Sequence, residues 1–325
     1  MSSSKGWIRP GILWVVVLGV VACSTPAATP SPTPAPGPFS LTVLYTNDGW
    51  GYTEPCACDP AVGGLARRAA YIRSVRESAT NVLLVDSGDS LLTLQRMGDR
   101  EQGKLLAEAF NQMGYDGVAL GGMDFRMGFD ILREQIEVAG FPVLSANTLD
   151  PQTGDVFDRA YEVVERGGHR VALIGLTDPK IAAEVTQDQM QVLEPVSTLV
   201  DIVAAIKEDV DAIVVLSHLG AMYDINLGQV VPEIDLIVSG KDREVYLPAL
   251  DVNGALIVSA GSRGEYVGRI DLDFDVEGNV VSHHAQVQAL ADEIADDPDM
   301  RRWMAQSGLF AASALKSGES GGFTP

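Results

Sequence analysis

A series of short apolar runs, each ending in a polar turn, is the feature that most constrains how this chain can fold. The first run covers residues 41–45 and leads into Asp48, and the second covers residues 81–89, which read NVLLVDSGD. Apolar runs of this length are typical of buried strands. Segments with helical spacing of apolar residues, such as residues 101–113, lie between the runs. Strands that alternate with helices predict an α/β fold, in which polar residues after successive strands collect at one sheet edge.

Glycine turns add antiparallel pairs to this pattern. Gly167-Gly168 and the turn around Gly278 each separate two strand-like runs, as β-hairpin turns do. The predicted hairpins pair residues 158–164 with 169–176 and residues 266–274 with 280–287. The sheets are therefore predicted to be mixed.

Three further elements are predicted from local pattern. A helix after Gly64 has an apolar face that includes Leu65 and leaves Arg68 largely outside it. One continuous strand is expected over residues 142–149, and a C-terminal helix over residues 299–315.

The first residues predict export from the cytoplasm. Lys5 and Arg9 precede an apolar run of about 12 residues, whereas a helix needs roughly 20 to cross a bilayer. Residues 20–22 with Cys23 resemble a lipobox, which implies cleavage before Cys23 and lipid on its sulfur. The alternative is an ordinary signal peptide with an incidental cysteine. Residues 24–38 alternate Pro with Ser, Thr and Ala, which is typical of an extended tether.

These features predict an extracytoplasmic lipoprotein that is anchored to a membrane through Cys23. The predicted organisation is a signal peptide at residues 1–22, the lipidated Cys23 and Pro-rich tether at 23–38, one domain at 39–315 and a flexible tail at 316–325. The formal net charge is −21, and no long basic run follows the signal. Nucleic acid is therefore not an expected partner, because phosphate backbones are bound by clusters of Lys and Arg. A protein partner and a small-anion partner both stay open.

Two cysteines lie one residue apart after the first predicted strand. In an oxidising compartment Cys56 and Cys58 are able to pair as a disulfide, although so small a ring is strained. Two alternatives stay open: both thiolates bind a soft metal or take part in redox chemistry, or both thiols are free and inert.

Polar residues that suit a metal site follow three of the predicted strands. Asp48, Asp89 and His218 each end or follow an apolar run. Carboxylates and imidazole at one sheet edge are what a metal-dependent phosphoesterase needs, because bound cations polarise the phosphoryl group and activate a water. We expect the three side chains to converge, with Asp124 and Asp242 at the rim of the pocket and with Cys56 and Cys58 close by.

The order of the motifs resembles a known family. TNDGWG, GGLARRAAYI, LLVDSGDS, MGYDGVALGGMDF, PVLSAN, LIGLTD, IVVLSHLG, DLIVSG and GEYVGRIDLDF follow one another along the chain. This series is similar to the N-terminal domain of the 5'-nucleotidase branch of the calcineurin-like metallophosphoesterases, from residue 41 to about residue 274. The resemblance implies an α/β sandwich with mixed sheets flanked by helices, and a site for two metal ions.

The chain departs from the family at several ligand positions. Asp48, Asp89 and His218 match it, but other residues stand where the family has His or Asn: Trp50, Gly122, Met123, Lys241 and Arg243. Neither Trp nor Gly offers a ligand atom on its side chain, and Lys and Arg are cations. The dinuclear site is therefore expected to be largely lost, with at most one divalent ion and no assigned catalytic residue.

Three interpretations of function follow. The first is a surface-anchored binding or assembly protein on a phosphoesterase scaffold, in which Lys241 and Arg243 form a cationic anion site. The second is an active hydrolase of phosphoesters or nucleotides, or a thiosulfohydrolase-like enzyme, with an atypical metal site at Asp48, Asp89 and His218. The third is a redox or soft-metal protein that uses Cys56 and Cys58.

Overall fold

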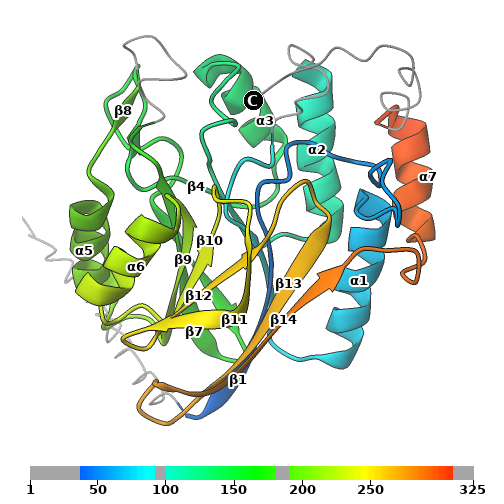
Figure 1. Cartoon of the computed structure of the whole chain (residues 1–325). Helices are drawn as coiled ribbons and strands as arrows, with labels where there is room; N and C mark the ends of the chain where they lie inside the picture. Colours follow the sequence, from blue (N-terminus) through cyan, green and yellow to red (C-terminus); the bar gives the residue numbers. More distant parts are fainter. Residues whose placement is uncertain (1–36, 92–99, 181–189, 310–325) are drawn as a thin grey trace, which may run out of the picture. The chain divides into compact units, whose positions relative to one another are not determined.

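Two six-stranded sheets form the centre of the domain (Figure 1). The structure is a computed structural model, and it describes residues 37–91, 100–180 and 190–309. The predicted signal, Cys23 and most of the tether lie outside the described residues, as does the predicted tail. Within the described ranges, no helix is both long enough and apolar enough to cross a membrane.

The first sheet has the strand order β14-β13-β1-β2-β3-β4. Strands β1 to β4 are parallel, whereas β13 pairs antiparallel with both β1 and β14. Its strands are β1 (Phe39–Thr46), β2 (Val82–Asp86), β3 (Gly117–Ala119), β4 (Val143–Leu144), β13 (Tyr266–Phe274) and β14 (Val280–Ala289).

The second sheet has the strand order β11-β12-β10-β9-β7-β6. Its four inner strands are parallel, and the edge strands β6 and β11 are antiparallel to their neighbours. Its strands are β6 (Tyr161–Arg166), β7 (His169–Thr177), β9 (Ala212–His218), β10 (Leu236–Ser239), β11 (Val245–Val252) and β12 (Ala255–Ala260). A small separate sheet pairs β5 (Thr148–Leu149) with β8 (Gln191–Val192).

Helices cover the outer face of each sheet, and the inner faces pack on each other. The first sheet is covered by α1 (Leu65–Ser78), α2 (Arg100–Met113), α3 (Phe129–Val138) and α7 (Pro298–Ser307), and the second by α5 (Pro195–Ile206) and α6 (Ala221–Val230). In Figure 1, α5 and α6 are drawn at the left and α1 and α7 at the right.

Strand β1 shows why the apolar runs are continuous. Val43 and Tyr45 belong to the core between the two sheets, whereas Leu44 belongs to the core under the helices. Successive strand residues point to opposite faces, so a strand that is buried on both faces has to be apolar at every position. The predicted α/β sandwich, with mixed sheets and two hairpins, is confirmed.

Two predicted elements are wrong in detail. Residues 142–149 are not one strand: β4 ends at Leu144, and the next amides, of Ser145 and Ala146, bond outside the first sheet, to Arg159 and Gly175. Helix α7 ends at Ser307, because Gly308 takes the left-handed conformation that terminates helices.

Three elements were not predicted. Strand β8 has only two residues, helix α6 has little amphipathic pattern in its sequence, and edge strand β11 is largely exposed and contains Pro248. All three therefore lack the apolar periodicity on which the prediction depends.

Candidate metal centre

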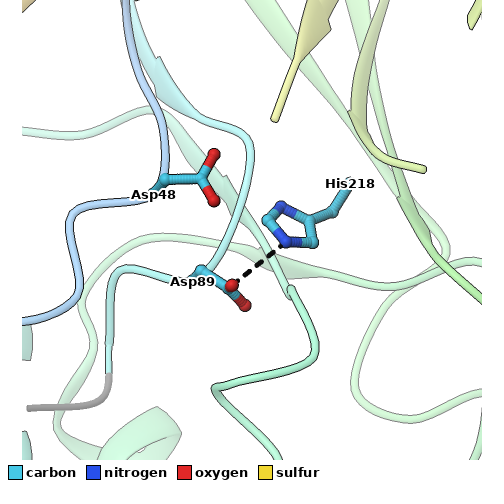
Figure 2. Close-up of side chains that lie close together, drawn as sticks. All are labelled: Asp48, Asp89 and His218. Carbon is cyan, nitrogen blue, oxygen red and sulfur yellow. Dashed lines mark ion pairs between the residues drawn. The ribbon is translucent and has the colours of Figure 1, made fainter. Parts of the chain in front are cut away.

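Asp48, Asp89 and His218 come together where the ends of strands from the two sheets meet (Figure 2). Asp48 follows β1, Asp89 follows β2, and His218 is the last residue of β9 in the other sheet. One ligand atom from each residue lies within 4.8 Å of those of the other two, and all three residues are buried. The expected convergence is confirmed, and a role as metal ligands stays a prediction.

Asp48 has one carboxylate oxygen without a partner. Its Oδ2 accepts hydrogen bonds from Asn47 Nδ2 at 3.0 Å and from the Lys241 backbone N–H at 2.8 Å. Among the described residues no donor reaches Oδ1, although this atom is buried. Burial raises the pKa of Asp48. A buried oxygen with no partner is costly, and a bound cation at this position would satisfy it.

Asp89 and His218 form a buried ion pair. Asp89 Oδ2 lies 3.2 Å from His218 Nε2, and Asp89 Oδ1 accepts a hydrogen bond from the Met123 N–H at 2.7 Å. His218 Nδ1 lies 2.9 Å from the Ser87 carbonyl oxygen, which only accepts, so Nδ1 carries a hydrogen.

The charges in this pair stabilise each other. Burial opposes a charged His218, but the carboxylates of Asp89 and Asp48 raise its pKa to about 10. Burial also opposes a charged Asp89, but His218 holds the pKa of Asp89 below its usual range. Without a metal, the His218 imidazolium supplies the positive charge that the two carboxylates require.

Two glycines make room for the His218 ring. A Cβ on Gly121 would overlap Asp89 Oδ1 and lie 2.7 Å from His218 Nε2, and a Cβ on Gly240 would lie 2.7 Å from His218 Nδ1. Real Cβ atoms do not approach other atoms this closely, so the cluster requires glycine at both positions. Both glycines follow apolar runs in the sequence, so glycine at successive strand ends is a sequence signal for this site.

Asp124 is buried and therefore does not lie at the rim of the cluster. Its Oδ2 accepts hydrogen bonds from the Asp89 and Gly121 N–H groups, and its Oδ1 accepts one from Leu91, all at 2.9 Å. The prediction for Asp124 was wrong because its carboxylate is used to hold the loop that carries Asp89. Asp242 is exposed and accepts a hydrogen bond from the Ala221 N–H at the start of α6.

Comparisons with known proteins agree with this geometry. No protein-family model matches the chain. A 5'-nucleotidase of Bos taurus is 26% identical, over 96% of this chain and 59% of its own length. A solved 5'-nucleotidase precursor of Thermus thermophilus superposes with a TM-score of 0.75 at 27% identity, over 84% of this chain and 59% of that chain. The chain folds as a 5'-nucleotidase-type metallophosphoesterase domain.

Other matches limit how far this likeness extends. A sulfate thiohydrolase of Thermus thermophilus, at 20% identity and a TM-score of 0.73, covers 82% of this chain and 60% of that chain, and it shares the fold. The chain spans 50% to 63% of the length of the curated relatives that it matches.

The metallophosphoesterase domain has an aromatic and cationic layer where the family has ligands. Trp50 Nε1 lies 3.4 Å from Asp89 Oδ2, and the Arg243 guanidinium stacks over the Trp50 ring at 4.1 Å from its centroid. Lys241 forms an ion pair with Asp178, so its charge is already compensated. Met123 contributes its backbone N–H to Asp89 and carries no oxygen or nitrogen on its side chain.

Cys56 and Cys58 are joined in a disulfide in the loop between Asp48 and α1. Cys58 is exposed and Cys56 is half-buried. The hydrogen bonds of Cys56 are made inside this loop, to Val62. In this paired form neither sulfur is a thiolate, so neither is available as a soft-metal ligand. Their predicted closeness to the metal cluster stays a prediction.

A buried polar network below the cluster was not predicted. Asp86 accepts hydrogen bonds from the Thr46 hydroxyl at 2.6 Å, the Ser90 hydroxyl at 2.9 Å and the Gly88 N–H at 2.9 Å, which fixes the turn before Asp89. Arg68 is 2% exposed, and one of its guanidinium nitrogens lies 3.4 Å from the Tyr115 hydroxyl. The expectation that Arg68 lies outside the buried face of α1 was wrong.

Proposed function

We propose that this domain binds one divalent metal ion through Asp48, Asp89 and His218, and that it has lost the efficient hydrolysis of a dinuclear centre. The observation that carries this proposal is the set of three ligand atoms, one from each residue, that lie within 4.8 Å of one another. The buried Asp48 Oδ1, which has no partner among the described residues, supports it. Two carboxylates and one imidazole suit a divalent ion such as Zn²⁺ or Mn²⁺. The residues present therefore fit one ion.

A second ion is disfavoured by the residues that surround the cluster. Trp50 and Arg243 stack on one another next to Asp89, and a guanidinium close to a cation site repels the cation. The Lys241 ammonium pairs with Asp178 and is not a ligand. Within the described ranges, one group of His, Cys, Asp and Glu side chains lies close enough together to hold a metal ion, and it consists of Asp48, Asp89 and His218.

The ligand that fits such a centre is a small oxyanion, with a phosphoryl group as the first candidate. A bound divalent ion supplies Lewis-acid chemistry, which polarises a phosphoryl oxygen and acidifies a bound water. Arg243 is exposed and provides a fixed planar donor for an oxyanion, held by the Trp50 ring. His218 has to release its Nε2 proton before that nitrogen is able to act as a ligand.

The direct test is the metal content of the chain expressed without residues 1–22. We expect about one Zn²⁺ or Mn²⁺ per chain after equilibration and dialysis, and none in an Asp89→Asn variant. Arg243→Gln is expected to weaken phosphate binding to the metal-loaded protein, whereas Arg302→Gln, on the exposed side of α7, is not. Two ions per chain would contradict the proposal.

A second candidate function is hydrolysis with a single ion, and the set of three protein donors favours it, because three protein ligands leave a further position of the ion open to water. Incubation with nucleoside monophosphates and an aryl phosphate separates the two candidates. We expect no metal-dependent turnover, because nothing replaces the His that the family has at the position of Met123. Turnover that Asp89→Asn abolishes would establish the hydrolase and reject the binding role.

We also propose that the protein is held at the extracytoplasmic face of a membrane by lipid on Cys23. The short apolar run before Cys23 and the Pro-rich residues 24–38 support this location. Cys23→Ser is expected to release the protein from membranes, and mass spectrometry is expected to find acyl groups on Cys23. Full retention of the Cys23→Ser form would reject the anchor.

A further inference from the structure

The loop between Asp48 and α1 contains a second reactive group, the disulfide of Cys56 and Cys58. We propose that this disulfide is a redox site, which accepts two electrons from a thiol reductant that attacks at Cys58. Neither cysteine is one of the proposed metal ligands, so the proposal does not rest on metal binding. Exposure supports it, because exposed disulfides are typically the labile ones. Cys58 is exposed at the surface, and so are its neighbours Ala57 and Asp59.

The two sulfur atoms have different surroundings. The Val62 backbone N–H points at Cys56 Sγ with an N to S distance of 3.3 Å, whereas Cys58 Sγ lies 3.3 Å from the Pro60 carbonyl oxygen. An N–H donor stabilises a thiolate, and a carbonyl oxygen favours a protonated thiol. Cys56 is therefore the better leaving group, and Cys58 is the sulfur that a reductant attacks and that becomes a neutral thiol.

The base of the loop is held independently of the disulfide. The Cys56 N–H donates to the Val62 carbonyl at 2.8 Å, and Gly63 N–H donates to the Leu290 carbonyl at 2.9 Å. Arg67 also donates to the Ala61 carbonyl at 2.9 Å. These bonds keep Cys56 next to Val62 when the disulfide opens, so reduction does not require the loop to refold.

The proposed reaction is balanced thiol–disulfide exchange. A reductant thiolate attacks Cys58 Sγ, forms a mixed disulfide and breaks the bond to Cys56, which leaves as a thiolate beside the Val62 N–H. A second thiolate attacks the reductant sulfur of the mixed disulfide and releases Cys58, which takes up a proton. The protein gains two electrons and one proton as a Cys56 thiolate and a Cys58 thiol, and the two reductant thiolates become one disulfide.

The test uses the full chain with Cys23→Ser, in which Cys56 and Cys58 are the only cysteines. The native protein is equilibrated with mixtures of reduced and oxidised glutathione, and thiols are alkylated and counted by mass spectrometry. We expect reversible reduction of Cys56–Cys58 without loss of the circular-dichroism spectrum. A disulfide that stays closed until denaturant is added, or cysteines that never pair, would overturn the proposal.

The mixed disulfide shows which sulfur is attacked. The oxidised protein is mixed with reduced glutathione, quenched early with acid and mapped by mass spectrometry, and we expect glutathione on Cys58 and a free thiol at Cys56, because Cys58 is exposed and Cys56 is half-buried. Glutathione found mainly on Cys56 would reject attack at Cys58.

The role of the Val62 N–H has its own control. Val62→Pro removes the N–H and keeps the carbonyl that binds Cys56, and it is expected to slow reduction by about tenfold. Val62→Ala keeps the N–H and is expected to react as the parent does. If both variants react at the parent rate, the Val62 N–H does not stabilise the leaving thiolate. If both are slowed equally, packing of the Val62 side chain is responsible and the proposed asymmetry is wrong.

Discussion

His218 shows how one residue is fixed by neighbours from distant parts of the chain. Its ring lies between Gly121 and Gly240, its Nδ1 bonds to Ser87, and its Nε2 pairs with Asp89. These neighbours follow three different strands, β2, β3 and β10. The position of the ring therefore depends on the absence of side chains at the two glycines as much as on the acid beside it.

Gly121→Ala tests this dependence. The added Cβ has to displace Asp89 and His218, so we expect a loss of about 1–3 kcal/mol in the free energy of unfolding, measured by urea denaturation. Metal binding is expected to weaken in the same variant. Gly140→Ala is the matched control, because its added Cβ meets only the exposed side chain of Asn111. A Gly121→Ala protein as stable as the parent would contradict the packing of the cluster.

At the scale of elements, buried acids hold the strand ends of the second sheet in place. Asp224 on α6 accepts hydrogen bonds from Ser217 at the end of β9 and from Ser239 at the end of β10. Asp235 accepts a hydrogen bond from the Ile213 N–H at 2.8 Å, between the starts of the same two strands. One acid therefore fixes each end of this strand pair.

Replacement of Asp224 is expected to lower the stability of the folded protein. Asp224→Ala leaves two buried hydroxyl groups without their acceptor, and we expect a loss of about 2–4 kcal/mol in the free energy of unfolding. Asp224→Asn keeps one oxygen acceptor and is expected to lose less. Asp201→Asn, on the exposed face of α5, provides the control in urea denaturation. Equal stability of Asp224→Ala and Asp201→Asn would show that the link between strand ends contributes nothing.

Asp235 is expected to make the free energy of unfolding fall as the pH rises. Burial raises its pKa to about 7, above the value of about 3.9 expected in the unfolded chain. Between these two values the folded state holds a proton that the unfolded state has released, so stability falls as pH rises from about 4 to about 7. Asp235→Asn removes this loss and is expected to be more stable than the parent at pH 8 by about 1–3 kcal/mol. Thermal unfolding at pH 5 and pH 8 checks this, and an unchanged difference between the two pH values would contradict it.

At the scale of the whole molecule, the cluster joins the two sheets. Asp48 and Asp89 follow strands of the first sheet, and His218 ends a strand of the second. A metal ion at this position would therefore connect the two halves of the sandwich, and binding to the folded state alone raises stability.

Zn²⁺ or Mn²⁺ is expected to raise the melting temperature by several degrees. At about 100 times the dissociation constant, a ligand specific for the folded state contributes about 2.7 kcal/mol. Asp48→Asn is expected to abolish the increase, and Asp201→Asn is expected to preserve it. A rise of the same size in the Asp48→Asn protein would place the ion elsewhere.

The sequence by itself determined most of the local elements and the placement of Asp48, Asp89 and His218 at the ends of strands. The closeness of Asp48 and Asp89 could be predicted because parallel strands bring their carboxyl ends to a common edge, whereas the position of His218 beside them depends on how the two sheets pack. Only the tertiary structure decided which strands share a sheet, that Arg68 and Asp124 are buried, and that Arg243 stacks on Trp50. Local patterns record periodicity within one element, whereas burial of a charge and stacking of two side chains depend on partners that lie far away in the sequence.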